Sequence, residues 1–230
     1  MDPERIRSRL EDLTEVLKSS LTRERFLYSS CYCEENVYQA INELKTNENF
    51  KTYSLVRDGL LEMHTIFIIN PIKAVPIWKQ NVRSSEDAPV IWDYYVILSL
   101  CLMKSFDAHW ILDFDTSLPL ITPFEDYCTS SFRPLAAEYQ EYSRYYRVVE
   151  ADLYIENFAS DRSHMRTKDG GWLSTPPNYP LIWPKRDTKM NLMKYNTYDA
   201  TEECHGNSPF KYGRIYSEVD FFALKFIISS

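Results

Sequence analysis

The segment SSCYCEENVY, residues 29–38, brings two cysteines, two glutamates and the start of an apolar run close together. The run continues at helical spacing through Val37, Ile41 and Leu44. We therefore expect a helix that begins directly after Cys33, with Glu34 and Glu35 in its first turn. Unpaired N–H groups at a helix N-terminus favour the thiolate, which is the nucleophilic form of cysteine. The alternatives are that Cys33 is a small buried hydrophobe, or that the two glutamates oppose its ionisation.

Strand-like segments follow this helix in close succession. They are HTIFII (64–69), VPIWKQ (75–80), PVIWDYYVILSL (89–100) and AHWILDFD (108–115). Short polar turns separate them, which is typical of an antiparallel sheet. The longest apolar run, around residues 96–103, is too short to span a membrane and is expected to be a buried strand.

The second half of the chain alternates short elements with one long loop. We expect a helix over 134–146, a strand over 146–151, a helix over 152–158 and a last helix over 217–228. A proline-rich loop, residues 160–188, is expected to be an ordered cover. The chain is thus expected to be α+β, with a mainly antiparallel sheet and flanking helices in a single compact domain.

The N-terminal residues 3–21 carry a separate amphipathic pattern. Asp2 is a plausible N-cap and Pro3 a plausible first helical residue. We expect an N-terminal helical extension over residues 1–26 and the main domain over 27–230. Packing on the domain surface is favoured over a membrane or partner-binding role, because the polar face of the helix mixes both charge signs.

Composition argues against several function classes. The net charge of −7 is unlike the basic face that nucleic acid requires, so we expect no nucleic-acid partner and no membrane association. Five glycines form no phosphate-binding motif, and the four histidines are scattered singly, so neither a nucleotide nor a metal is expected. Five cysteines without framework spacing indicate reduced thiols, as in the cytoplasm or the nucleus.

Several sequence blocks, in order along the chain, resemble the protein N-terminal glutamine amidohydrolase family. They are YSSCYCEENVY (28–38), VPIWKQ (75–80), PVIWDYYV (89–96), LDFDTSLP (112–119), NFASDRSHM (157–165), PPNYP (176–180) and KMNL (189–192). The resemblance implies deamidation of an N-terminal glutamine to glutamate with release of ammonia, which feeds the N-degron pathway. It also implies a fold related to transglutaminase and papain-like thiol enzymes, and a monomer without a cofactor.

The same resemblance implies a Cys-His-Asp catalytic triad. Its thiol corresponds to Cys33 and its carboxylate to Asp113, but the family block W-D-Y-H-V reads WDYYV here, so Tyr95 occupies the histidine position. A phenol has a pKa near 10 and is a poor proton shuttle at neutral pH. Among the other histidines, His109 is too far along its strand to share Asp113, while His164 lies on a loop that could fold over the site.

Substrate recognition requires a carboxylate for the α-ammonium group of an N-terminal glutamine. Glu34, Glu35, Asp93 and Asp161 are the candidates. A solvated helix start is an equally good interpretation of the two glutamates. The oxyanion hole would use the N–H of Cys33 and a second donor that the sequence does not identify.

Two other functions remain open. The chain could be a non-catalytic family member that still binds N-terminal glutamine in the same pocket. A papain-like peptidase or a transglutaminase-type transferase is the third hypothesis, and it would require a long open cleft. The family-specific blocks and the tyrosine at position 95 count against this third hypothesis.

Overall fold

The computed structural model describes Leu17, Ser19, residues 21–48, Val56, residues 58–59, 61–82, 87–102, 109–183, 190–202 and 210–224. In this part of the chain, an antiparallel sheet has the strand order β6-β5-β4-β1-β7-β8. Its strands are β1 (Leu61–Ile69), β4 (Tyr95–Leu102), β5 (His109–Leu112), β6 (Ile121–Pro123), β7 (Tyr145–Glu150) and β8 (Arg214–Ser217). A separate ribbon pairs β2 (Val75–Ile77) with β3 (Val90–Trp92).

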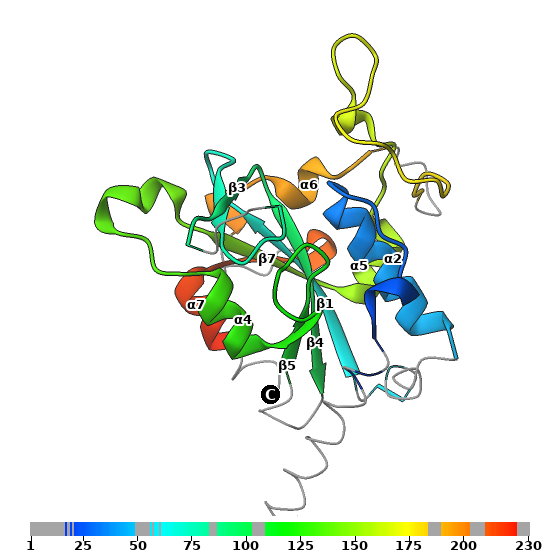
Figure 1. Ribbon diagram of the computed structural model, residues 1–230, viewed down its shortest axis with the longest axis horizontal. Helices are drawn as coiled ribbons and strands as arrows, with labels where there is room; N and C mark the ends of the chain where they lie inside the picture. Colours follow the sequence, from blue (N-terminus) through cyan, green and yellow to red (C-terminus); the bar gives the residue numbers. More distant parts are fainter. Residues whose placement is uncertain are drawn as a thin grey trace, which may run out of the picture.

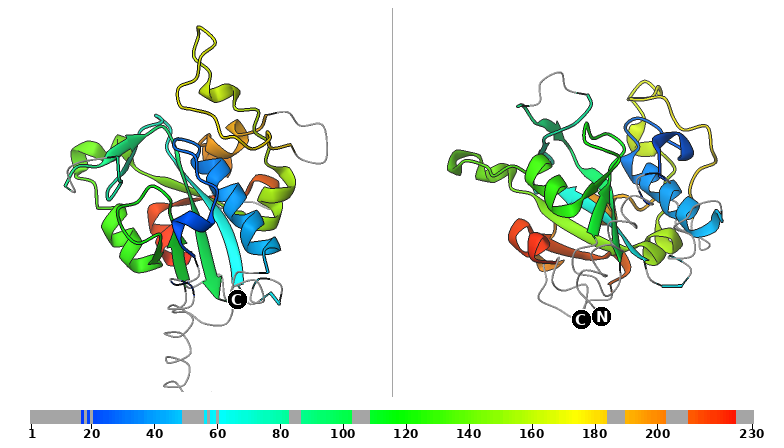
Figure 2. Two further views of the ribbon diagram at one scale, coloured as in Figure 1. Left: turned by 45° about the vertical axis from the view of Figure 1, so that its right-hand side comes forward. Right: turned by 60° about the horizontal axis from the view of Figure 1, so that its bottom comes forward.

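Helices cover both faces of the sheet (Figures 1 and 2). One face carries α2 (Cys33–Thr46), α5 (Ala151–Asn157) and α6 (Met193–Asn196). The other face carries α4 (Phe124–Ser131) and α7 (Glu218–Ala223). Short 3-10 turns are η1 (Arg23–Arg25), η2 (Ala137–Tyr142), η3 (Ser163–Met165), η4 (Ala200–Glu202) and η5 (Phe210–Tyr212).

Burial on both faces explains the nearly continuous apolar strands. On β1, Phe67 and Ile69 pack toward α2, while Ile66 and Ile68 pack toward α4 and α7. Successive strand residues point to opposite faces. At the start of β4, Val96 therefore belongs to the α2 side and Tyr95 to the α4 side.

The long loop after α5 is anchored to the turn that precedes α2. Residues 160–183 leave the body and return to it as an arch, drawn in yellow in Figure 2. Its base is closed by the bridge between Ser160 and Ile182. The hydroxyl of Tyr32 donates to the carbonyl of Ser174 at 3.2 Å, and the Ser174 hydroxyl donates to the carbonyl of Ser30 at 3.2 Å. These contacts hold the arch against the start of α2.

The structure confirms the predicted α+β domain with a mainly antiparallel sheet and the helix that begins at Cys33. The predicted helix over 134–146 is wrong, because only η2 forms and Tyr145 already starts β7. Tyr146 is fully buried on the sheet opposite Ile68, so tertiary packing overrides the helical pattern of this segment. The predicted strand over 89–100 is interrupted at Asp93 and Tyr94, and β8 was not predicted.

The predicted N-terminal helix lies almost entirely outside the described residues, and so do residues 184–188 and 225–228 of the predicted loop and last helix. Leu17 and Leu21 are described and are buried in the same core cluster as α2. The boundary between residues 26 and 27 stays a prediction. No helix in the described residues is both long and apolar enough to cross a membrane.

Candidate active site

A strained turn presents Cys33 as the first residue of α2. Cys31 adopts a φ of 66°, which is uncommon for a residue other than glycine. The side chain of Asn36 clamps the turn, since it accepts from the N–H of Ser29 at 2.8 Å and donates to its carbonyl at 2.9 Å. The turn also buries Tyr32 completely. Non-glycine residues held at positive φ are frequent at functional sites.

Tyr95 and Asp113 are joined directly. The hydroxyl of Tyr95 donates to Asp113 Oδ1 at 2.5 Å, and both side chains are buried. Burial and the charge of Asp113 raise the pKa of Tyr95 well above its usual value. Tyr95 is therefore a neutral hydrogen-bond donor fixed on the carboxylate, with its ring stacked on Trp92 at a centroid distance of 5.3 Å.

Asp113 collects donors from three further groups. They are the hydroxyl of Tyr127 at 2.8 Å, the side-chain amide of Gln80 at 3.4 Å and the N–H of Asp115 at 2.9 Å. Burial nevertheless raises the pKa of Asp113, because its hydrogen bonds only partly offset the loss of hydration.

The segment after β5 is tied to the N-terminal segment of the chain. Arg23 donates to the carbonyls of Phe114 and Thr116, the latter at 2.8 Å. The hydroxyl of Tyr28 donates to Asp115 Oδ1 at 2.5 Å. Arg23, which precedes the predicted domain boundary, and Tyr28, which follows it, thus hold the segment directly after Asp113.

The sulfur of Cys33 lies where the two apolar clusters meet, because Cys33 packs against both. Burial is the main cause that raises its pKa well above the usual value, followed by the charges of Glu34 and Asp115. The backbone N–H of Val96 opposes this change. The helix N-terminus therefore does not lower the pKa of Cys33 overall, since desolvation and nearby carboxylates dominate, in line with the alternative that a neighbouring glutamate opposes its ionisation.

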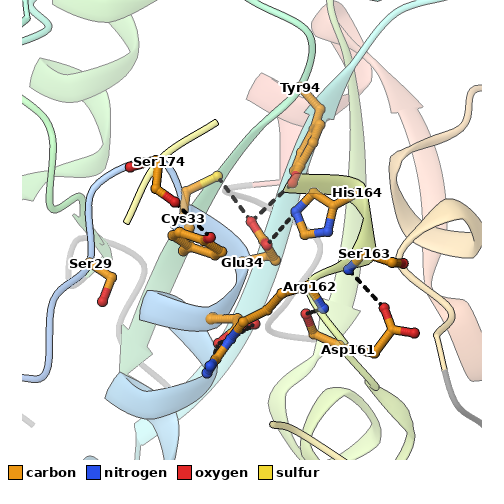
Figure 3. A network of polar contacts seen from close by, with 12 residues as sticks. Ser29, Cys33, Glu34, Tyr94, Asp161, Arg162, Ser163, His164 and Ser174 are labelled. Carbon is orange, nitrogen blue, oxygen red and sulfur yellow. Dashed lines mark hydrogen bonds and ion pairs between the residues drawn. The ribbon is translucent and has the colours of Figure 1, made fainter. Parts of the chain in front are cut away.

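Glu34 lies between the thiol and His164 (Figure 3). Its Oε2 accepts from the hydroxyl of Tyr94 at 3.0 Å and from the thiol of Cys33 at 3.7 Å. Its Oε1 lies 3.3 Å from His164 Nε2, but neither atom makes a hydrogen bond with a described residue. The carboxylate is fully buried, so a solvated helix start is excluded. Oε1 therefore has acceptor capacity that no hydrogen bond from a described residue uses.

Glu35 has a different environment although it is the next residue. Arg162 donates to both of its oxygens, with distances between 2.8 Å and 3.1 Å, and both side chains are buried. Arg162 also donates to the carbonyls of Pro177 and Tyr179, each at 3.1 Å. This pairing connects α2 to the long loop and engages the carboxylate that was a candidate for substrate binding.

Comparison with known proteins identifies the family. The model of the N-terminal glutamine amidase family matches residues 28–225. The chain belongs to this family. Proteins called protein N-terminal glutamine amidohydrolase, from Bos taurus and Homo sapiens, are each 39% identical over 181 residues, which cover 79% of this chain and 82% of the relative. The protein of that name from Drosophila melanogaster is 38% identical over 161 residues, or 67% of this chain and 71% of the relative.

The other two candidate carboxylates of this N-terminal glutamine amidase family member lie nearer the surface. Asp93 is exposed and accepts from the N–H of Tyr94 at 3.0 Å, and its charge still raises the pKa of Cys33. Asp161 is half-buried and accepts from the N–H of Ser163 at 2.9 Å, which stabilises the start of η3.

Two of the described histidines, His109 and His164, have different surroundings. His109 lies on the α4 side, 2.6 Å from the hydroxyl of Ser99 and stacked on Phe124 at 4.0 Å, which accounts for it structurally. His164 is the histidine that contacts the surroundings of Cys33. In the described part of the chain, no three histidine, cysteine, aspartate or glutamate side chains come together as a possible metal site.

Sequence reasoning missed several residues of the site, among them Gln80, Tyr94, Tyr127 and Arg162. Tyr94 lies beside position 95 in the block PVIWDYYV, so its place in the sequence could have indicated that it belongs to the site. Tyr127 and Gln80 reach Asp113 from α4 and from the segment after β2, which only the three-dimensional fold brings together.

Proposed function

We propose that the chain hydrolyses the side-chain amide of N-terminal glutamine in proteins and peptides, giving N-terminal glutamate and ammonia. The observation that carries this proposal is the thiol of Cys33 at the start of α2, beside the buried carboxylate of Glu34 with one unused oxygen. Family membership over residues 28–225 and the names of the relatives support the same substrate.

Glu34 receives the α-ammonium group of the substrate in this proposal. It is buried, it has acceptor capacity left on Oε1, and it lies next to the nucleophile. Glu35 is held by Arg162, which leaves Glu34 as the better candidate. Asp93 adds negative potential near the thiol from the turn before β4.

The chemistry proceeds through a thioester. The sulfur of Cys33 attacks the side-chain carbonyl carbon, the carbon–nitrogen bond breaks, and the leaving nitrogen takes up through solvent the proton that the thiol has lost, so that ammonia departs. Water then attacks the thioester, the carbon–sulfur bond breaks, and glutamate is released. The N–H of Cys33 has no intrahelical partner and is a natural oxyanion donor.

Position 95 makes turnover slow in this proposal. An imidazole there would take the thiol proton and transfer it to the departing ammonia, with Asp113 as its orienting group. Tyr95 instead donates a hydrogen bond to Asp113, and its raised pKa keeps it a neutral phenol, which does not accept the thiol proton at neutral pH. This observation also favours a second candidate function, namely capture of N-terminal glutamine without turnover.

The wider context follows from the same resemblance. Three candidate site residues follow one another along the chain: a thiol at a helix start, position 95 at the start of β4, and a carboxylate directly after β5. This order is compatible with a transglutaminase or papain-like core. Cys31, Cys33, Cys101 and Cys128 are free thiols, which is compatible with a cytoplasmic or nuclear protein. We expect the chain to act as a monomer.

The test uses a short peptide that begins with glutamine and the same peptide with an acetylated N-terminus. Ammonia and the amide-to-acid mass change are measured, and peptide binding is measured by calorimetry. The enzyme hypothesis predicts ammonia from the free peptide only, and none with Cys33→Ala. Binding of the free peptide without ammonia supports the capture function, whereas neither binding nor ammonia overturns both.

A further inference from the structure

Glu34 is shared between the nucleophile and an open position. One oxygen, Oε2, is occupied by the hydroxyl of Tyr94 and the thiol of Cys33. The other oxygen, Oε1, faces His164, whose two ring nitrogens also lack a hydrogen-bond partner among the described residues. Glu34 Oε1 accepts no hydrogen bond from a described residue, so it can receive one from a group with several N–H donors, and an α-ammonium has three.

Negative charges from three elements raise the pKa of Cys33. They are those of Glu34 on α2, 3.7 Å from the sulfur, of Asp115 in the segment after β5, and of Asp93 in the turn before β4. The neutral phenols of Tyr94 and Tyr95 and the imidazole of His164 complete the surroundings. The backbone N–H of Val96 is the stabilising donor on the other side. The free protein therefore keeps Cys33 as a neutral thiol.

We propose that Glu34 makes the ionisation of Cys33 depend on the α-ammonium group of the substrate. This inference rests on the proposed function. An ammonium at Oε1 neutralises the carboxylate that lies 3.7 Å from the sulfur through its other oxygen. The repulsion that holds the proton on sulfur then falls, and the proton is released to water.

This coupling would determine specificity. An internal or N-acetylated glutamine has no ammonium, so it leaves the carboxylate charged and the thiol neutral. A free N-terminal glutamine brings its side-chain amide and its activating charge in one short residue, with the reacting atoms about 3–3.5 Å apart in a productive complex. His164 acts as a positioning residue, because its Nε2 lies 3.3 Å from Glu34 Oε1 and so borders the position that the ammonium takes.

The experiment measures the pKa of Cys33 from the pH dependence of its Cβ chemical shift in cysteine-labelled protein, with Cys33→Ser for assignment. It is recorded without ligand, with the N-terminal glutamine peptide, and with its acetylated form. We expect the free peptide to lower the pKa by about one pH unit or more and the acetylated peptide to leave it unchanged. Glu34→Gln should lower it without ligand and abolish the response, whereas Glu43→Gln, on the same helix, should behave as the natural chain.

The inference is overturned if the pKa of Cys33 is unchanged at the highest concentration of free peptide. It is also overturned if the acetylated peptide changes this pKa equally, or if the free peptide changes it equally in the Glu34→Gln variant. If Glu34→Gln does not fold, the two peptide arms on the natural chain still decide. Ammonia is measured in the same samples. Ammonia without a pKa response leaves the proposed function standing and removes the coupling, while a pKa response without ammonia supports the coupling and the capture function.

Discussion

Tyr95 and Asp113 share a hydrogen bond of 2.5 Å in which the phenol is the donor. Three other donors converge on the same carboxylate, from Tyr127, Gln80 and the backbone of Asp115. The hydrogen bonds around Asp113 are therefore well formed. Tyr95, however, donates a hydrogen bond at the position where the family pattern places a histidine, which can accept a proton. Under the proposed mechanism, we therefore expect proton transfer to limit turnover.

At the residue scale, Glu35 and Arg162 form a buried ion pair with bonds to both carboxylate oxygens. Breaking such a pair costs about 3–5 kcal/mol, because the remaining charge is left buried without a partner. We expect Glu35→Gln to lower the free energy of unfolding by about that amount in urea denaturation. Glu43→Gln, a matched change on α2, should stay within about 0.5 kcal/mol. An equally small effect for Glu35→Gln would show that the pair contributes little.

Asp115 supplies a prediction on pH. Burial raises its pKa above the usual 3.8, although the hydroxyl of Tyr28 and the charge of Arg23 oppose this. The folded state therefore binds the proton more tightly than the unfolded state, and stability falls as the pH rises from about 4 through the folded-state pKa. Asp115→Asn should remove this loss of stability. In thermal denaturation, the melting temperature of the variant should therefore rise relative to that of the natural chain between about pH 4 and about pH 7. A stability difference between the two proteins that is constant with pH would contradict this prediction.

At the element scale, apolar periodicity predicted the elements whose conformation depends on residues close in sequence, such as α2. The stripe of Val37, Ile41 and Leu44 is enough to define α2, and all three side chains are buried. The segment 134–146 has a comparable helical pattern, yet Tyr146 is taken into β7 by its partners across the sheet. The Glu35–Arg162 pair joins residues that are 127 positions apart, so no local pattern could indicate it.

Gly213 tests how β8 is attached to the sheet. It has a φ of +78°, and an added Cβ would collide with the carbonyl of Val148 and lie 2.7 Å from Val149 Cγ2. Gly170 has a similar φ of +87° but open space around it. We expect Gly213→Ala to cost about 1–3 kcal/mol more than Gly170→Ala in urea denaturation, because both carry the backbone strain and only the first adds a collision. Equal losses would mean that β8 adjusts freely.

At the scale of the whole molecule, the sheet brings together groups from both of its faces. Cys33 comes from α2 on one face, while Tyr95 packs with α4 and α7 on the other. Cys33 packs against the apolar clusters of both faces, and the arch of residues 160–183 is anchored to the turn that precedes α2. The family blocks supplied the candidate site residues, which stay predictions, whereas the partners of Asp113 and the enclosure of Glu34 could be found only from the fold.

The central claim is that this chain retains the thiol chemistry of its family and lacks the proton carrier at position 95. The most direct test is the rate of ammonia release from a peptide with N-terminal glutamine, compared between the natural chain, Tyr95→His, Tyr95→Phe and Cys33→Ala. We expect Tyr95→His to raise the rate by about 10⁴-fold, as for restoring one member of a coupled catalytic unit. Tyr95→Phe should give no gain, and Cys33→Ala should abolish release. A natural chain that already turns over as fast as Tyr95→His would contradict the claim.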